Sequence, residues 1–135
     1  AGCYRHGSFR IAGSHHIPPN AMKVADQMEE LFTEIQSITD PIERAAKLHH
    51  GIVRIHPFTD GNGRVARLAM NSILLAAAYP PISIPTDLRQ AYCNTLEAAD
   101  SGDFESWQNF LTEQLNQELD EWLSALGETP DSGSE

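Results

Sequence analysis

This chain is organised around the stretch His56-Pro57-Phe58-Thr59-Asp60-Gly61-Asn62-Gly63-Arg64-Val65-Ala66-Arg67. An apolar run from Leu68 to Tyr79 follows directly, which predicts that the stretch leads from a loop into a helix. The first backbone N–H groups of a helix have no partner within it, and the helix dipole favours an anion beside them. Gly61 and Gly63 allow the backbone to approach a ligand closely and to adopt positive φ. These features predict a site for a polyphosphate.

The side chains of this stretch match the chemical roles needed for phosphorus transfer. His56 has an ordinary pKa near neutrality and is the candidate general base for a hydroxyl. Asp60 offers carboxylate oxygens suited to Mg²⁺, and the Asn62 amide can donate to a phosphate oxygen. Arg64 and Arg67 are three residues apart, so their guanidinium groups share one helix face and can bind phosphate oxygens. The set predicts transfer of a nucleotide phosphorus group to a hydroxyl.

The stretch resembles the signature of the Fic family, H-P-F-x-(D/E)-G-N-G-R-x-x-R, at every fixed position. The resemblance extends over nearly all of residues 2–125. It implies an all-α core around a central buried helix, with a short β-hairpin flap at the N-terminus. It also implies a protein adenylyltransferase, which moves AMP from ATP to a Ser, Thr or Tyr hydroxyl of a target protein and releases pyrophosphate. Gly63 favours AMP transfer, because the phosphorylating Doc branch of the family carries lysine there.

Three alternatives remain open at this stage. The same His56 and Asp60 could serve a hydrolase that removes AMP from a modified protein. Family members that do this use an inhibitory glutamate to place water, and that glutamate is not found here. The fold also transfers other nucleotide moieties, from UTP or CDP-choline. A non-catalytic interaction module is disfavoured by the intact signature.

Residues 1–19 are punctuated by glycine and proline and have no helical pattern. Apolar and polar side chains alternate along Phe9, Arg10 and Ile11, as they do along an extended strand. Gly7 and Ser8 could turn a short hairpin. In Fic proteins a β-hairpin flap covers the active site and aligns an extended segment of the target by main-chain pairing. The resemblance therefore assigns Phe9, Arg10 and Ile11 to a target-aligning flap.

The remaining pattern predicts one domain at residues 1–127, with the flap region at 1–19 and a helical core at 20–127. Helices are expected at 20–38, 41–55, 61–79, 87–99 and 104–126. Apolar residues occur on all sides of the third helix after its arginines, which predicts a helix surrounded by the others. His49 falls on the apolar stripe of the second helix and is interpreted as a buried hydrogen-bonding residue. The tail at 128–135 is polar and predicted to be disordered.

The stretch from Arg89 to Ala99 resembles the part of the family that builds the adenosine pocket. Tyr92 or Cys93 would face the base there, and Asp100 would lie near it, so Tyr92 is a candidate nucleotide-binding residue. The dipole at the end of the second helix favours the charged form of His56, whereas burial opposes it. The sequence leaves the direction of the His56 pKa open.

The composition of the chain argues against some classes of binding partner. The chain has 135 residues and a formal net charge of −10, which argues against a nucleic-acid or anionic-membrane surface. Its two cysteines are interpreted as reduced thiols. No signal peptide is recognised and no apolar run is long enough to span a bilayer, so we expect a cytoplasmic protein.

Regulation is inferred from the family resemblance alone. Many Fic proteins carry an inhibitory helix, (S/T)-x-x-x-E-(G/N), whose glutamate pairs with the second arginine of the signature, here Arg67. We expect that helix upstream of Ala1 or on an antitoxin chain, and we expect this chain alone to be de-repressed. A homodimer is an alternative that the sequence leaves open.

Overall fold

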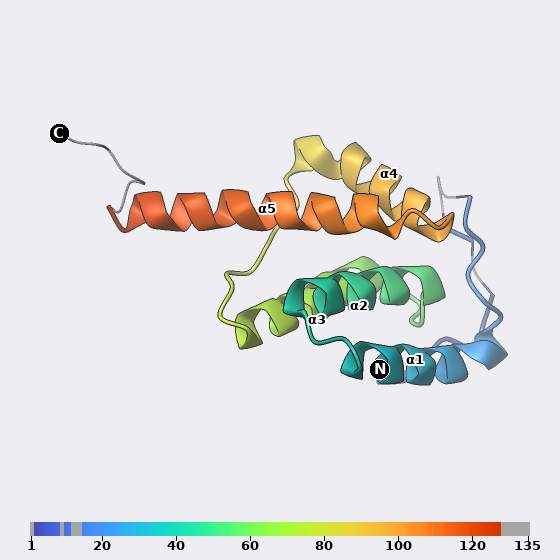
Figure 1. Ribbon diagram of the computed structural model, residues 1–135. Helices are drawn as coiled ribbons and strands as arrows, with labels where there is room; N and C mark the ends of the chain where they lie inside the picture. The colour runs from blue at the N-terminus through green and yellow to red at the C-terminus, as the bar shows by residue number, and fades with distance from the viewer. Residues whose placement is uncertain (1, 9, 12–14, 128–135) are drawn as a thin grey trace.

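The structure is a computed structural model that describes residues 2–8, 10–11 and 15–127. This described part is helical and contains no β-strand. The elements follow in the order α1 (Ala21–Gln36), α2 (Pro41–Ile55), α3 (Asn62–Ala76), the 3₁₀ turn η1 (Thr86–Leu88), α4 (Arg89–Asp100) and α5 (Phe104–Ala125). In Figure 1 they stack as three layers, with α4 and α5 above, α2 and α3 in the middle, and α1 below.

The helix at the centre of the fold is α2. It packs against each of α1, α3, α4 and α5. Ala45 and Ala46 are completely buried on it, and their small side chains let the neighbouring helices approach closely. The prediction that residues 61–79 form the surrounded helix is therefore wrong. Leu68 and Leu75 of α3 are 71% and 55% exposed, because α3 is covered on the α2 side and open on the other.

Helix boundaries follow local capping chemistry. Asp40 caps α2 as predicted, because its carboxylate accepts hydrogen bonds from the first N–H groups of the helix. The third helix ends at Ala76 and not at Tyr79 as predicted. The cause is Ala78, which has a left-handed φ of 67°, so that the N–H of Tyr79 turns back to the carbonyl of Leu74 at 2.9 Å. This is a Schellman arrangement, which ends a helix before a proline is reached.

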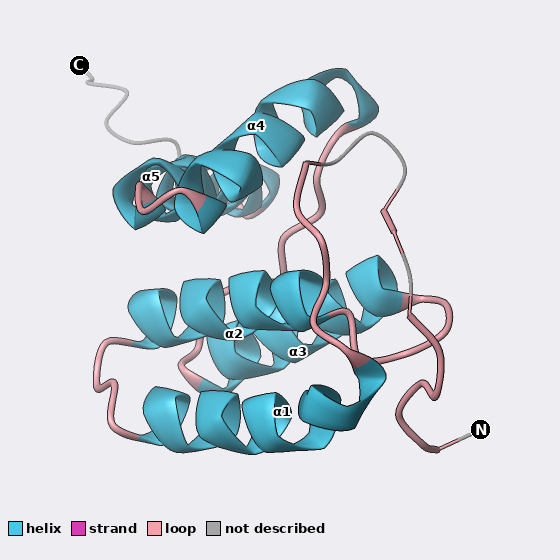
Figure 2. Ribbon diagram, turned by 90° about the vertical axis from the view of Figure 1, so that its right-hand side faces the viewer, coloured by secondary structure: helices cyan, strands magenta, loops and turns pink. Residues whose placement is uncertain are grey.

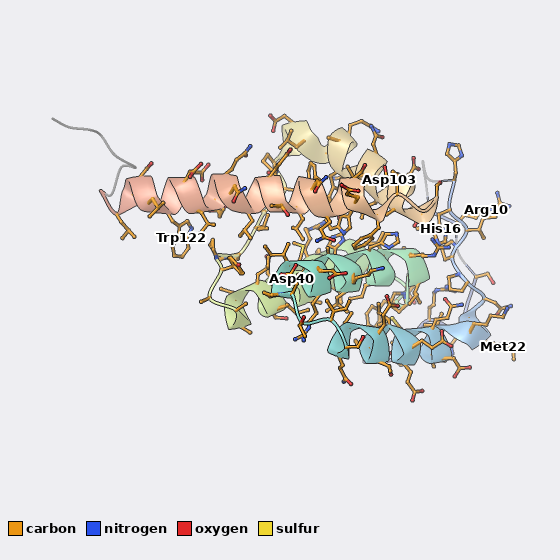
Figure 3. The ribbon with its side chains drawn as sticks, in the orientation of Figure 1. Arg10, His16, Met22, Asp40, Asp103 and Trp122 are labelled. Carbon is orange, nitrogen blue, oxygen red and sulfur yellow. The ribbon has the colours of Figure 1, made fainter. Side chains whose placement is uncertain are left out.

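The upper layer is anchored by α5. Trp107 is fully buried, and its indole N–H donates to the carbonyl of Ala46 at 2.9 Å. Phe110 and Leu111 continue the same buried stripe. The predicted stripe does not stay buried to the end of the helix, because α5 extends past the other helices and Trp122 is about half exposed (Figures 1 and 3).

The described residues of the N-terminal segment form a loop that runs along one end of the helical layers (Figure 2). Phe9 and residues 12–14 lie outside the described residues, so the predicted β-hairpin is not shown and stays a prediction. The tail at 128–135 also lies outside them. Cys3 and Cys93 are free thiols, as predicted. Among the helices that are described, none is both long enough and apolar enough to cross a membrane.

Candidate active site

His56 stands directly after α2, where Pro57 prevents the helix from continuing. Its backbone is left-handed, with φ 54° and ψ 60°, which is uncommon for a residue that has a Cβ atom. The N–H of His56 donates to the carbonyl of Ile52 at 2.8 Å, and its carbonyl accepts from Nε of Arg5 at 2.6 Å. The backbone of the candidate base is thus held by contacts on both sides.

The environment of His56 favours the neutral imidazole. Burial lowers its pKa below the ordinary value, and the positive charges of Arg5 and His16 lower it further. Arg5, from the N-terminal segment, supplies the larger of these two charge effects. The neutral form is the one that accepts a proton, so the site suits a general base.

Asn62 closes the loop between the two helices. Its Oδ1 accepts from the N–H of Phe58 at 2.9 Å, and its Nδ2 donates to the carbonyl of Phe58 at 2.8 Å. The side chain is buried, so its amide is committed to the loop. The predicted donation from this amide to a phosphate stays a prediction. The backbone N–H of Asn62 stands at the first position of α3, where a helix has unpaired donors.

The two glycines of the stretch have different functions. Gly61 caps α3 with φ 79°, a conformation that costs a residue with Cβ. Gly63 lies inside the helix, so the prediction of positive φ is confirmed at Gly61 only. A Cβ at Gly63 would lie 3.4 Å from Nη1 of Arg67. The guanidinium of Arg67 therefore lies against the bare backbone at the N-terminus of α3, where an anion is favoured.

Asp60 and Arg64 form an ion pair at 3.5 Å, with side chains that are 92% and 73% exposed. No group of three or more His, Cys, Asp or Glu residues that could hold a metal occurs in the part of the chain that the structure describes. Mg²⁺ in nucleotide sites is usually held by one or two carboxylates together with substrate phosphates. The exposed carboxylate of Asp60 fits a metal that arrives with a nucleotide.

Arg67 lies near a buried polar contact between Tyr92 and His49. The hydroxyl of Tyr92 lies 2.9 Å from Nε2 of His49, and both residues are buried. Burial raises the pKa of the Tyr92 phenol, while the charge of Arg67 and its hydrogen bond to this phenol lower it. Burial and the charges of Arg67 and His50 lower the pKa of His49 to about 3. His49 is thus the buried hydrogen-bonding residue predicted, and Tyr92 contacts Arg67 as well as the cavity described next.

A cavity of about 720 Å³ opens beside α3. Arg64, Arg67 and Arg89 contribute positive charge to it, and the exposed Leu68 and Leu75 form much of its apolar wall. The other lining residues are Asn71, Pro81, Ile82, Ser83, Ile84, Thr86, Tyr92 and Cys93. His56 and Asp60 are not part of this lining. Arg64 and Arg67 belong both to the signature stretch and to the lining of the cavity, so the cavity lies beside the signature loop.

Asp100 does not line this cavity. Its carboxylate accepts from Nε2 of His50 at 2.8 Å and from Nη1 of Arg54 at 3.3 Å. The prediction that Asp100 lies near a nucleotide base therefore gains no support from the cavity. Cys93, the other residue predicted to face the base, does line it.

The flap residues are only partly described. Phe9 lies outside the described residues, Arg10 is exposed and Ile11 is half-buried. Figure 3 shows Arg10 and His16 at the same end of the molecule. The imidazole of His16 is 2.7 Å from the carbonyl of Arg54, which ties the segment to the last turn of α2. Sequence reasoning missed Arg5, which lies within the predicted flap region at residues 1–19.

Comparison with known proteins agrees with this geometry. A family model described as the Fic/DOC family matches residues 1–74. The protein adenylyltransferase Fic of Drosophila melanogaster is 37% identical over 133 residues, which cover 96% of this chain and 27% of that protein. The chain thus spans little more than a quarter of the length of its fly relatives.

Solved structures show the same fold. A fragment of Fic-1 from C. elegans matches with a TM-score of 0.75 at 30% identity, covering 89% of this chain and 37% of that chain. A Fic family protein from Desulfovibrio desulfuricans matches with a TM-score of 0.81 at 30% identity, covering 96% of this chain and 43% of that chain.

Proposed function

The chain belongs to the Fic/DOC family, and on this premise we propose that it transfers AMP from ATP to a Ser, Thr or Tyr hydroxyl of a target protein. The observation that carries the proposal is the placement of His56. A histidine with a lowered pKa is joined by a short loop to a helix N-terminus that has two arginines on its first turns. A proton acceptor and an anion site thus lie on one short loop, as phosphorus transfer to a hydroxyl requires.

The reaction can be written with these residues. The imidazole of His56 takes the proton of the target hydroxyl, whose oxygen forms a bond to the α-phosphorus of ATP. The bond between the α-phosphorus and the bridging oxygen to the β-phosphorus breaks, and pyrophosphate leaves. The backbone N–H groups of Gly61–Gly63 hold phosphate oxygens. Arg64 and Arg67 offset the negative charge of the β- and γ-phosphates.

Mg²⁺ would be held by Asp60 together with the nucleotide. When bound, it neutralises phosphate charge and orients the phosphate groups. Arg64 now pairs with Asp60. On nucleotide binding, Arg64 would exchange this exposed and weak ion pair for phosphate oxygens.

The N-terminal segment is the proposed guide for the target. Phe9, Arg10 and Ile11 would pair their main chain with an extended target segment and bring its hydroxyl to His56. The hydrogen bond between His16 and the carbonyl of Arg54 supports this assignment, because it anchors the segment to the end of α2. Arg10 is exposed, as a residue that receives a partner must be.

The cavity beside α3 is the proposed site of an inhibitory helix, supplied by a longer form of the chain or by an antitoxin. Its exposed apolar wall at Leu68 and Leu75 would cover the apolar face of such a helix. Its arginines would bind a glutamate, with Arg67 as the partner. A peptide with the (S/T)-x-x-x-E-(G/N) pattern should then inhibit the chain but not a Leu75→Glu variant. Equal inhibition of both would place the helix elsewhere.

The first experiment is incubation of the chain with Mg²⁺ and α-labelled ATP, beside His56→Ala and a γ-labelled control. We expect label from the α position on protein, none with His56→Ala, and none from the γ position. Binding of ATP to His56→Ala, measured by calorimetry, shows that the variant keeps its nucleotide site. If His56→Ala transfers AMP at the wild-type rate, His56 is not the general base.

Other outcomes separate the alternatives. Label only from the γ position would assign the chain to phosphate transfer. Failure to label, together with release of AMP from a pre-modified protein, would assign it to hydrolysis. Labelling from UTP in place of ATP would assign it to transfer of another nucleotide.

A further inference from the structure

Arg5 is 3% exposed, although it is a charged residue outside any helix. Within the described part of the chain, its guanidinium donates to four carbonyl oxygens: Nε to His56 at 2.6 Å, Nη1 to Gly7 at 2.7 Å, and Nη2 to Pro19 at 2.5 Å and to Ile55 at 3.2 Å. These carbonyls belong to the N-terminal segment, to the residues before α1 and to the end of α2. One side chain therefore joins three parts of the chain at the candidate base.

We propose that Arg5 is the positioning residue of His56: its guanidinium binds the last carbonyls of α2 and fixes the left-handed backbone from which the imidazole projects. The proposal deepens the proposed function, since His56 is the general base in it. Arg5 does not touch the nucleotide in this scheme. It acts through His56.

The chemistry explains why an arginine is needed. The last carbonyls of a helix have no intrahelical donor, and burying them unpaired is unfavourable. The carbonyls of Ile55 and His56 are two such groups, and Arg5 supplies both with donors. Guanidinium is planar and has five N–H donors, whereas an ammonium group is a compact charge with three. With three donors, lysine could not bind all four of the carbonyls that Arg5 binds.

The backbone of the two segments is also joined directly. The N–H of Arg5 donates to the carbonyl of Pro57 at 2.8 Å. The left-handed φ of His56 is an unfavourable conformation that persists only where its surroundings hold it. Bonds from Arg5 to the carbonyls before and after the turn are what hold it here.

The same side chain sets the charge near the base. Among the described residues, Arg5 and His16 of the N-terminal segment add to the effect of burial on the His56 imidazole. Each positive charge disfavours a second one on the imidazole, so Arg5 keeps His56 in its proton-accepting form. Replacing Arg5 by an uncharged residue should raise the pKa of His56. Replacing it by lysine, which keeps the charge but lacks the planar guanidinium, should not.

Three variants test the proposal. Arg5→Met removes both charge and donors, and Arg5→Lys keeps the charge. Arg44→Lys is the matched control, because Nε and Nη2 of Arg44 donate to the carbonyl of Ile38, at 2.9 and 2.5 Å, before α2 and far along the chain from His56. The readouts are the His56 pKa from imidazole NMR titration, and kcat and KM for ATP in AMP transfer.

We expect Arg5→Met to raise the His56 pKa and to lower kcat about tenfold or more, with KM for ATP within about twofold. Arg5→Lys should lower kcat with a smaller change in the pKa. Arg44→Lys should change neither. If Arg5→Met has the same His56 pKa and the same kcat as the wild-type protein, the proposal is wrong. Equal losses of kcat in Arg5→Lys and Arg44→Lys would also overturn it, because Arg5 would then be merely structural.

Two further measurements keep the test decisive. If Arg5→Met does not fold, the exchange rate of the Arg5 Nε–H in the wild-type protein decides. Slow exchange supports its bond to His56, and exchange as fast as that of an exposed arginine overturns it. If the wild-type chain transfers no AMP, the proposed function fails, but the titrations of His56 in Arg5→Lys and Arg5→Met still decide the role of Arg5.

Discussion

The hydroxyl of Tyr92 lies 2.9 Å from Nε2 of His49, and the imidazole is completely buried. Nδ1 of the same ring has no hydrogen-bond partner among the residues that the structure describes. Buried polar groups are normally paired, so this ring depends on Tyr92 for its polar contact. Because the charge of Arg67 also acts on this hydroxyl, the contact links the core to the candidate phosphate site.

Tyr92→Phe should therefore have two effects. Loss of the hydroxyl leaves His49 without a partner, which we expect to lower the free energy of unfolding by about 1–3 kcal/mol. Arg67 also loses its polar neighbour in the core, so we expect affinity to fall several-fold for ATP and little for AMP. Urea unfolding and calorimetry with both nucleotides measure these effects. Tyr79→Phe is the control, and an equal loss of ATP affinity in both variants would contradict the prediction.

His49 predicts a pH dependence of stability. Its pKa is about 3 in the folded state, and the ordinary value is 6.5. Between these values the unfolded chain binds a proton that the folded chain does not. Stability from His49 is therefore full above pH 6.5 and falls toward pH 3, by about 1.4 kcal/mol per pH unit.

His49→Gln removes this titration but can still accept a bond from Tyr92. At pH 7 we expect the variant to be the less stable protein, because Gln packs less well than imidazole against Trp107, whose ring lies 4.7 Å away. Its deficit should shrink as the pH falls from 6.5 to 4.5. Urea unfolding at several pH values measures the difference, and a constant deficit would show that the histidine does not titrate as expected.

Two glycine substitutions should have opposite signs. Gly61→Ala places a Cβ at φ 79° and 3.2 Å from Nη2 of Arg64, so we expect a loss of about 1 kcal/mol. Gly63→Ala places a Cβ in ordinary contact with Arg67 inside a helix, so we expect a gain of about 0.5–1 kcal/mol. Thermal unfolding compares the two. Destabilisation by Gly63→Ala would mean that Arg67 cannot yield to a methyl group.

Asn62→Ala should open the loop before α3. It removes both hydrogen bonds to Phe58, which we expect to cost about 2 kcal/mol of stability. AMP transfer should fall strongly, because Asp60 and Gly61 lie on the same loop. Asn62→Asp keeps the acceptor for the Phe58 N–H and should be intermediate. If Asn62→Ala keeps wild-type stability and loses only affinity for ATP, the prediction is wrong. The amide of Asn62 would then be a phosphate ligand.

The signature stretch could be interpreted from sequence because its chemistry is local. His56 follows α2 because Pro57 ends a helix, and Gly61 starts α3 because it accepts positive φ. Arg64 and Arg67 share the wall of one cavity because helical spacing places them on one face. The cap at Asp40 was predictable for the same reason. Each of these outcomes depends on neighbours within a few residues.

The amino-acid order alone therefore determined the helices, the signature loop and the kind of ligand that its helix N-terminus suits, because capping, proline and helical periodicity act over short distances. Only the tertiary structure decided that α2 is central, that Asn62 is committed to Phe58, and that Arg5 holds the carbonyl of His56. Such contacts join residues far apart in the chain, as Arg5 and His56 are. Burial then shifts charge equilibria, including the pKa of His56, in ways that spacing along the sequence does not indicate.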